Sequence, residues 1–206
     1  MKLITVNTPF MDENAYLIST EKGAVIIDPG EMNEEIKEFI SENSEKEFAI
    51  LLTHNHFDHI MGADEARSLS NGKIFISGVD AKGLSDGMIN LSERFCIPLA
   101  PFEADCIFND GDELFIGDIT VKVMATGGHS PGSACFIIGD WIFSGDTLFR
   151  LSVGRTDFTG GDRTEQIKSL KALAALTGEY EVYPGHGPAT RLSFEKNYNP
   201  YIKEIL

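Results

Sequence analysis

The chain has 206 residues, and its 17 Lys and Arg against 32 Asp and Glu give a formal net charge of −15 with histidine neutral. That balance argues against a nucleic-acid groove, which needs cationic side chains to displace counterions, and against docking on anionic lipid. Hydrophobic residues at 42% and aromatic residues at 10% exclude a disordered chain, and one set of motifs predicts a single domain over residues 1–206.

Apolar runs in the first half of the chain predict short strands and one clear helix. The expected strands cover residues 3–6, 15–18, 24–27, 48–52 and 73–77. Met32, Ile36, Phe39 and Ile40 recur at helical spacing among glutamates, which is typical of an amphipathic helix, and residues 60–69 suit another. Glycines interrupt residues 78–105, so this stretch is expected to be a loop excursion over one face of the domain.

The second half predicts an antiparallel meander followed by a helix, a last strand and a helical tail. The meander strands are expected at residues 113–116, 119–125, 134–138 and 141–143. Asp162 and Glu165 have the spacing of a capping box, with Asp162 as N-cap of the helix, and a strand follows at residues 180–183. Mixed strands and helices of this order predict an α/β fold with helices outside two packed sheets.

The cysteines and the N-terminus bear on the cellular compartment. Cys96, Cys106 and Cys135 are odd in number and form no C-x-x-C, so a disulfide framework is not expected and a reducing compartment is favoured. The first seven residues turn polar too soon for a signal peptide, and no apolar run approaches the roughly 20 residues of a membrane helix. We expect a cytoplasmic protein with no membrane partner.

Each of the five histidines comes shortly after a strand-like apolar run, and two aspartates share this placement. These residues are His54, His56, His59, His129, His186, Asp28 and Asp146. Ligand sites in layered α/β proteins gather at the carboxyl ends of strands. The sequence therefore predicts that these imidazoles and carboxylates converge on one rim.

The segment from His54 to His59 places three imidazoles and a carboxylate in six residues. Neutral imidazole and carboxylate suit zinc, iron or manganese. In an extended stretch His54 and His56 point the same way and could bind one ion, while Asp58 and His59 could bind a second. The alternative is a set of unrelated histidines, which is disfavoured because neighbouring imidazolium groups would repel one another without a metal.

Four motifs together resemble the metallo-β-lactamase superfamily and occur in its order. They are His-x-His-x-Asp-His (54–59), Gly-Gly-His-Ser-Pro-Gly (127–132), Ser-Gly-Asp-Thr-Leu-Phe (144–149) and Pro-Gly-His-Gly-Pro (184–188). The resemblance implies a four-layer αββα sandwich of two mixed sheets, with two divalent transition metals between the sheet edges. It implies that His54, His56 and His129 bind the first metal, that Asp58, His59 and His186 bind the second, and that Asp146 bridges both.

Asp28 matches the family's acidic residue behind the histidine loop, where it would orient that loop or a ligand imidazole. The alternative is a turn aspartate that bonds its own backbone. Asp58 is expected to be catalytic as well, because it could accept a hydrogen bond from the nucleophile. The metal is expected to be zinc, with iron or manganese as alternatives.

Residues 152–162 resemble a loop of small glyoxalase-II-like (hydroxyacylglutathione hydrolase-like) enzymes, and persulfide dioxygenases carry a similar Gly-Arg-Thr-Asp. Arg155 could hold a substrate carboxylate or pair with Asp157, and we favour the internal pair. The tail, residues 195–201, also resembles the small hydrolases, whose chain ends close to the metal site. Tyr198 and Tyr201 would then either line the pocket or pack within the tail.

The resemblance implies a hydrolase of a small-molecule substrate that attacks with a metal-bridging hydroxide. No histidine is left for general acid duty, which favours a thiol leaving group with its pKa near 8.5, and hence a thioester. The glutathione-gripping C-terminal segment of glyoxalase II has no counterpart here. The alternatives are a mononuclear-iron persulfide dioxygenase, then a lactonase or β-lactamase, then a non-enzymatic metal-binding scaffold.

Overall fold

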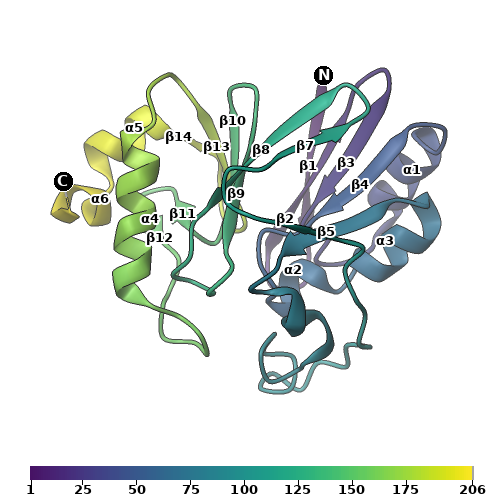
Figure 1. The fold of residues 1–206 in the computed structure, drawn as a ribbon, viewed down its shortest axis with the longest axis horizontal. Coiled ribbons are helices and arrows are strands. Elements are labelled where there is room, and N and C mark those ends of the chain that lie inside the picture. The colour runs from purple at the N-terminus through teal and green to yellow at the C-terminus, as the bar shows by residue number, and fades with distance from the viewer. Residues whose placement is uncertain (206) are drawn as a thin grey trace.

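In the computed structural model, which describes residues 1–205, two six-stranded sheets lie face to face and helices cover their outer faces (Figure 1). The first sheet has the order β1-β2-β3-β4-β5-β6. Its strands are β1 (Lys2–Thr8), β2 (Glu13–Ser19), β3 (Gly23–Ile27), β4 (Glu47–Leu51), β5 (Lys73–Ser77) and β6 (Cys106–Phe108). β1, β2 and β3 pair antiparallel, whereas β3 to β6 run parallel, so the sheet is mixed.

The second sheet has the order β14-β13-β10-β9-β8-β7. Its strands are β7 (Glu113–Ile116), β8 (Ile119–Ala125), β9 (Ala134–Ile138), β10 (Trp141–Gly145), β13 (Glu181–Pro184) and β14 (Thr190–Arg191), and a separate hairpin joins β11 (Leu148–Phe149) to β12 (Ser152–Val153). β7 to β10 form the predicted antiparallel meander, and β10 pairs parallel with β13.

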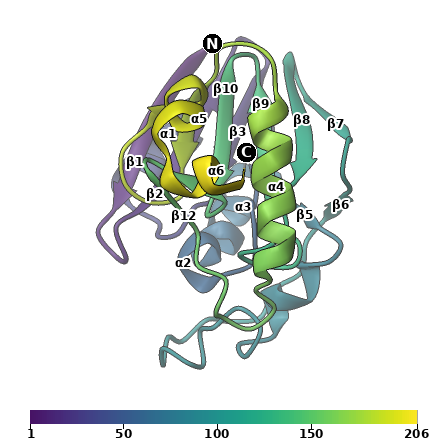
Figure 2. The same cartoon turned by 90° about the vertical axis from the view of Figure 1, so that its left-hand side faces the viewer.

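Helices form the two outer layers. α1 (Glu34–Glu42) and α3 (Ala63–Ser70) cover the first sheet, and α4 (Arg163–Ala175), α5 (Leu192–Tyr198) and α6 (Pro200–Ile205) cover the second, where they face the viewer in Figure 2. The short α2 (Phe57–Ile60) lies at the lower rim in Figure 1. No helix within residues 1–205 is long and apolar enough to cross a bilayer.

Three apolar cores separate the four layers, which confirms the αββα sandwich. Side chains alternate across a strand, so Ile26 of β3 packs under α1 with Ile36, whereas Val25 faces the second sheet with Phe136. A third core joins the outer face of the second sheet to its helices, and Leu170 of α4 belongs to it. β3 is buried along its whole length, which explains its continuous apolar run.

The predicted elements differ from the structure in places that have local causes. The helix expected at residues 60–69 is α3, which begins only at Ala63, and Ile60 ends the separate α2. Gly62 lies between them, and a Cβ there would come within 2.7 Å of Pro29 O. Asp162 does cap α4, but Glu165 pairs with Lys168 instead of returning to the cap. Strands β6, β11, β12 and β14 were not predicted, because two or three residues are too few to show a period.

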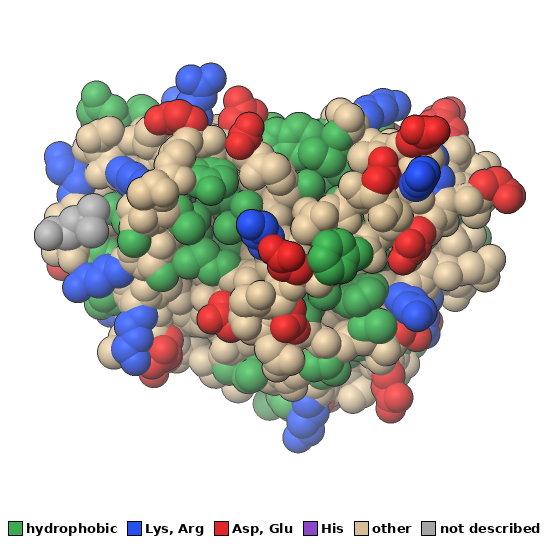
Figure 3. Space-filling model, turned by 45° about the horizontal axis from the view of Figure 1, so that its top comes forward, with side chains coloured by type: hydrophobic (Ala, Val, Ile, Leu, Met, Phe, Trp, Pro, Cys, Tyr) green, Lys and Arg blue, Asp and Glu red, His purple; other side chains and the backbone are tan. Residues whose placement is uncertain are grey.

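The surface carries its charges in a mixed pattern on the face seen in Figure 3. Acidic and basic side chains are interspersed there, and no described histidine is visible on it. That face lies toward the N-terminal edge of the molecule, away from the lower rim of Figure 1.

Candidate metal centre

The predicted convergence of histidines and aspartates is present at one rim of the two sheets. Asp28 follows β3, residues 54–59 follow β4, and His129 follows β8. Asp146 and His186 follow β10 and β13, the two parallel strands of the second sheet. The strand ends of both sheets meet here, and this position brings together residues up to 158 positions apart (28 to 186).

Three imidazoles form the first group that could hold an ion. His54, His56 and His129 are all buried, and each offers one ring nitrogen within 4.8 Å of the others. His56 Nδ1 lies 2.8 Å from His129 Nε2. His129 Nδ1 is already 2.8 Å from the carbonyl of Arg155, to which it donates in the neutral ring, so its Nε2 presents a lone pair. A cation between the ring nitrogens would satisfy this arrangement.

Asp58, His59 and His186 form a second group with ligand atoms within 4.8 Å of one another. His186 Nε2 lies 3.4 Å from Asp58 Oδ2. The Asp146 carboxylate stands between the two groups: its Oδ1 is 3.4 Å from His59 Nε2 and its Oδ2 is 3.4 Å from His129 Nε2. The geometry therefore has one carboxylate facing both groups.

Several buried polar atoms at the centre make no hydrogen bond within the described chain, although some of them lie close to an oppositely charged group. They include His54 Nε2, His59 Nε2 and Asp146 Oδ1. Buried polar atoms are rarely left unpaired, because desolvation without a hydrogen bond costs about 1–3 kcal/mol each. Since these atoms come from nitrogen and carboxylate ligands and face a shared space, the donor set fits transition-metal ions.

The pKa values of the imidazoles divide into two kinds. Burial lowers the pKa of His54 well below its usual value, and the neighbouring His59 adds to the effect. Burial and His129 lower the pKa of His56 to about 3. Burial also lowers the pKa of His59, but the carboxylates of Asp146 and Asp58 outweigh it and raise the pKa well above its usual value. His54 and His56 are thus neutral ligands at neutral pH.

Asp28 lies behind the histidine loop and holds it. Its Oδ1 accepts from Thr53 N at 2.7 Å, and its Oδ2 accepts from Thr53 Oγ1 at 2.5 Å and lies 3.0 Å from His59 Nδ1. The same threonine hydroxyl is 3.0 Å from His54 Nδ1. Asp28, His54 and His59 also come close enough to hold an ion, but these hydrogen bonds occupy Asp28. These contacts are the ones expected of a residue that orients the loop, the first of its two interpretations, and that role stays a prediction.

Asp80, which the sequence analysis did not single out, joins the two histidine loops. Its Oδ2 accepts from Asn55 N at 3.2 Å and from Ser130 Oγ at 2.6 Å, and its Oδ1 accepts from Gly132 N at 2.8 Å. Burial raises its pKa, although these hydrogen bonds oppose the shift. The sequence does contain a signal for Asp80, because this residue follows shortly after β5 just as Asp28 follows β3.

The cavity above the centre has a volume of about 480 Å³ and is lined by His56, Asp58, His129, Asp146 and His186 together with apolar side chains. Arg155 also lines it, but its guanidinium makes two hydrogen bonds to Asp157 at 2.6 and 2.7 Å, which is the internal pair expected from the sequence. The sequence analysis did not single out the aromatic residues of this wall. Phe57 and Phe149 lie within ligand motifs of the sequence, which is the signal that could have found them, whereas Phe158 lies in the loop of residues 152–162.

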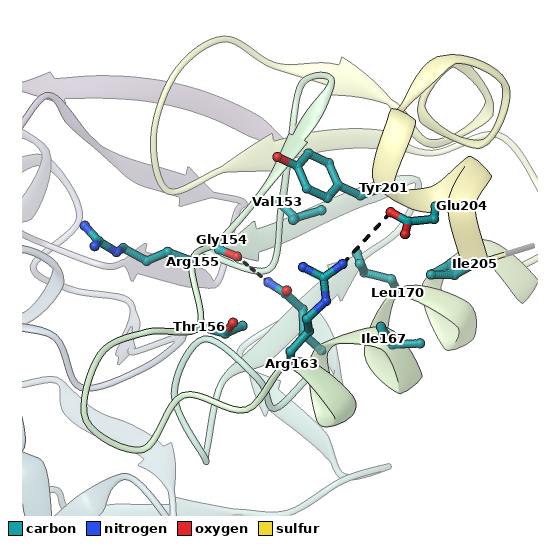
Figure 4. A pocket seen from close by; sticks show the side chains of 11 residues that line it. Val153, Gly154, Arg155, Thr156, Arg163, Ile167, Leu170, Tyr201, Glu204 and Ile205 are labelled. Atoms are coloured by element: carbon teal, nitrogen blue, oxygen red, sulfur yellow. Dashed lines mark hydrogen bonds and ion pairs between the residues drawn. The ribbon is translucent and has the colours of Figure 1, made fainter.

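The two tail tyrosines lie away from the metal cavity. Tyr201 of α6 lines a separate cavity of about 230 Å³, behind the loop of Gly154 and Arg155 (Figure 4). Tyr198 is 63% exposed and packs against Phe194. Within residues 195–205 the tail packs on α4, and neither tyrosine lines the metal cavity.

Comparisons with known proteins agree with this site. Residues 8–186 match the sequence model of the Metallo-beta-lactamase superfamily. The "Probable metallo-hydrolase YqgX" of Bacillus subtilis is 34% identical over 193 residues, 92% of each chain. The "Hydroxyacylglutathione hydrolase GloC" of Haemophilus influenzae is 32% identical over 200 residues, 95% of this chain and 94% of the relative.

Solved structures with the same fold cover nearly the whole chain. BLEG-1, described as a B3 metallo-beta-lactamase, has a TM-score of 0.88 at 33% identity and covers 98% of this chain and 99% of its own. TTHA1623 in a di-iron-bound form has a TM-score of 0.84 at 35% identity, and the match covers 96% of this chain and 99% of TTHA1623. ETHE1 from Myxococcus xanthus has a TM-score of 0.78 at 28% identity, and the match covers 97% of this chain and 84% of ETHE1.

Proposed function

The chain belongs to the metallo-β-lactamase superfamily, and from that premise we propose that it is a thioester hydrolase that works with two divalent metal ions. The observation that carries the proposal is the pair of ligand groups that face one carboxylate, Asp146. The similarity to a relative named hydroxyacylglutathione hydrolase supports the substrate class.

We assign the residues as follows. His54, His56 and His129 would hold one ion, Asp58, His59 and His186 the other, and Asp146 would bridge them. Zinc suits these ligands, and iron or manganese fits the same nitrogen and oxygen donors. The di-iron form of the similar TTHA1623 supports occupation of both positions.

When bound, the two metal ions would activate a water as nucleophile near neutral pH and polarise the substrate carbonyl. Asp58 Oδ2 stands at the cavity wall, where it would accept a hydrogen bond from the attacking water and keep a lone pair aimed at the substrate. All five histidines lie in the cluster, so none is free to protonate a leaving group. A thiol, which leaves with little help because its pKa is near 8.5, fits this site better than an amine.

The test is a substrate panel on protein loaded with zinc, iron or manganese. We expect hydrolysis of acyl thioesters, S-lactoylglutathione among them, and a thiol-trapping reagent would measure the released thiol. On peptides and DNA we expect no more than trace activity. Added salt should reduce the repulsion of DNA by the acidic chain. If every thioester is inert while glutathione persulfide consumes oxygen, the persulfide dioxygenase is the correct assignment.

Metal content should depend on pH differently at the two positions. Asp58 and Asp146 raise the pKa of His186 above its usual value despite the opposing effect of burial, and His59 shifts the same way. A proton with a raised pKa competes with the cation up to a higher pH, so the second position should empty first as pH falls. Elemental analysis should find about two ions per chain at pH 8 and nearer one at about pH 5.5. Simultaneous loss of both ions would contradict this assignment.

Asp80→Ala should weaken metal binding although Asp80 touches no proposed ligand atom. It removes the acceptor of two backbone N–H groups, those of Asn55 and Gly132, and one of the two partners of the Ser130 hydroxyl. Removing such an outer partner typically costs 10–100-fold in metal affinity. Competition with a chelator would measure the loss, with Asp140→Ala in an exposed turn as the matched control. Equal affinity of the two variants would show that Asp80 does not position the loops.

We further propose that the enzyme works in a reducing compartment, as expected for a cytoplasmic protein. Cys96, Cys106 and Cys135 are all free thiols. Burial raises the pKa of Cys135 to about 11, so this thiol stays protonated and unreactive at neutral pH.

A further inference from the structure

Apart from the proposed ligands, most side chains in the wall of the metal cavity are apolar. Its apolar members include Met11, Phe57, Leu91, Phe95, Phe149 and Phe158. Apart from the proposed ligands, Ser152 and Arg155 are the polar side chains that line it, and Asp157 occupies the Arg155 guanidinium. A small polar acyl group would therefore find few hydrogen-bond partners here.

The excursion at residues 78–105 supplies one side of this wall. Phe95 is 43% exposed, and its ring lies 5.4 Å from that of Phe57 and 6.2 Å from that of Phe158. The Phe158 ring in turn lies 6.0 Å from the His56 ring. Backbone hydrogen bonds tie the excursion to the centre, because Phe57 N donates to Asn90 O at 2.9 Å. The aromatic surface thus extends from the mouth of the cavity to a proposed metal ligand.

Two guanidinium groups, those of Arg94 and Arg155, lie over the Phe158 ring. Arg155 Cζ lies 4.0 Å from the Phe158 centroid and Arg94 Cζ lies 5.1 Å from it. Asp157 neutralises Arg155, whereas no ion pair of Arg94 occurs within residues 1–205. The neighbouring Glu93 lies instead against Gly87. The Arg94 guanidinium is therefore an exposed cation beside the Phe158 ring, with no ion pair among the described residues to hold it.

From this juxtaposition we propose that the preferred substrate is an apolar acyl thioester of an anionic thiol. The acyl chain packs on Phe57, Phe95 and Leu91, and the carboxylate or phosphate of the thiol part binds Arg94. This inference rests on the proposed thioester hydrolysis and adds its substrate class. It also gives the excursion a role as the specificity wall.

The acyl preference is tested with one thiol and a series of acyl groups. With metal-loaded protein, kcat/KM should rise roughly fourfold per added methylene from butanoyl to hexanoyl glutathione, and lactoylglutathione should be the poorest of the series. Phe95→Ala should remove most of this chain-length gain. Phe115→Ala, a 65% exposed phenylalanine on β7 away from the cavity, is the control and should leave the gain unchanged. No rise with chain length, or equal effects of the two variants, overturns the acyl preference.

The anion preference is tested with one acyl group and three thiols: neutral N-acetylcysteamine, glutathione with carboxylates, and coenzyme A with phosphates. Arg94→Gln should lower kcat/KM up to about fivefold for an anionic thioester and leave the neutral one unchanged, and high salt should shrink the loss. A larger loss with glutathione identifies a carboxylate partner, and a larger loss with coenzyme A identifies a phosphate. Arg191→Gln, on the exposed β14, is the control. Equal loss with all three thiols overturns the role of Arg94.

A binding measurement separates this inference from the proposed reaction. S-butyl and S-hexyl glutathione are thioethers that cannot be hydrolysed, and calorimetry on metal-loaded protein should find tighter binding of the hexyl form, reduced by Phe95→Ala. If all thioesters are inert but the hexyl form still binds more tightly, the proposed thioester hydrolysis is wrong and the proposed apolar binding surface is supported. If thioesters are cleaved without a chain-length or charge effect, the reaction stands and the inference fails.

Discussion

Asp146→Ala should abolish activity and remove at least one metal ion per chain. The carboxylate faces His59 and His129 from opposite groups and lies 3.7 Å from His186 as well, so its loss affects both proposed positions. Its removal takes one carboxylate oxygen away from each of the two groups, at His59 on one side and at His129 on the other. We expect a loss of more than about 1000-fold in kcat/KM, beyond the 10–100-fold typical of an outer partner.

Asp28→Ala is the matched comparison, because it removes a buried carboxylate from the same centre. Asp28 holds Thr53 and the Nδ1 side of His59, and takes no part in joining the two groups. Its removal should cost about 10–100-fold with most of the metal retained. Rates on the best thioester and the metal content of each variant decide the matter. Equal losses with equal metal content would mean that Asp146 does not bridge.

Much of the fold and the convergence at the centre follow from patterns that the sequence displays. Continuous or alternating apolar runs mark β3, β4 and the meander, and the position of a polar residue just after a strand identifies Asp28, His129 and Asp146. Because the strand ends of the two sheets meet at one rim, these separate motifs form one centre. Asp80 also lies shortly after a strand, but no ligand motif adjoins it in the sequence.

The apolar wall could not be predicted in the same way. Phe95 lies in a stretch without helical or strand period, and its position depends on tertiary contacts with Phe57 and Phe158 from distant segments. A phenylalanine in an irregular loop is assigned to the core by its composition alone. Only the three-dimensional arrangement distinguishes a cavity wall from a core, and the same holds for the tail tyrosines, which pack away from the centre.

Gly154→Ala should disable the enzyme without changing any ligand. The loop after β12 passes so close to the centre that a Cβ on Gly154 would overlap the carbonyl oxygen of Asp146 and come within 3.2 Å of His129 Nδ1. The loop and the imidazole are both held in place, since Gln166 Nε2 donates to Gly154 O from α4 and His129 Nδ1 lies 2.8 Å from the Arg155 carbonyl. The added methyl must therefore displace the Asp146 backbone, the His129 imidazole or the loop itself.

Displacement of a reacting geometry by about 1 Å can cost 100-fold in rate, so we expect at least that loss in kcat together with weaker metal retention. Overpacking itself costs about 1–3 kcal/mol of stability, which a thermal melt would record. Gly78→Ala is the control, because its new methyl would meet only the side chain of Ile107, which is 51% exposed and free to move. The comparison is made at equal folded fraction, so that loss of rate is read separately from loss of fold. Wild-type rate and metal content in Gly154→Ala would show that this loop does not hold the proposed bridging carboxylate in place.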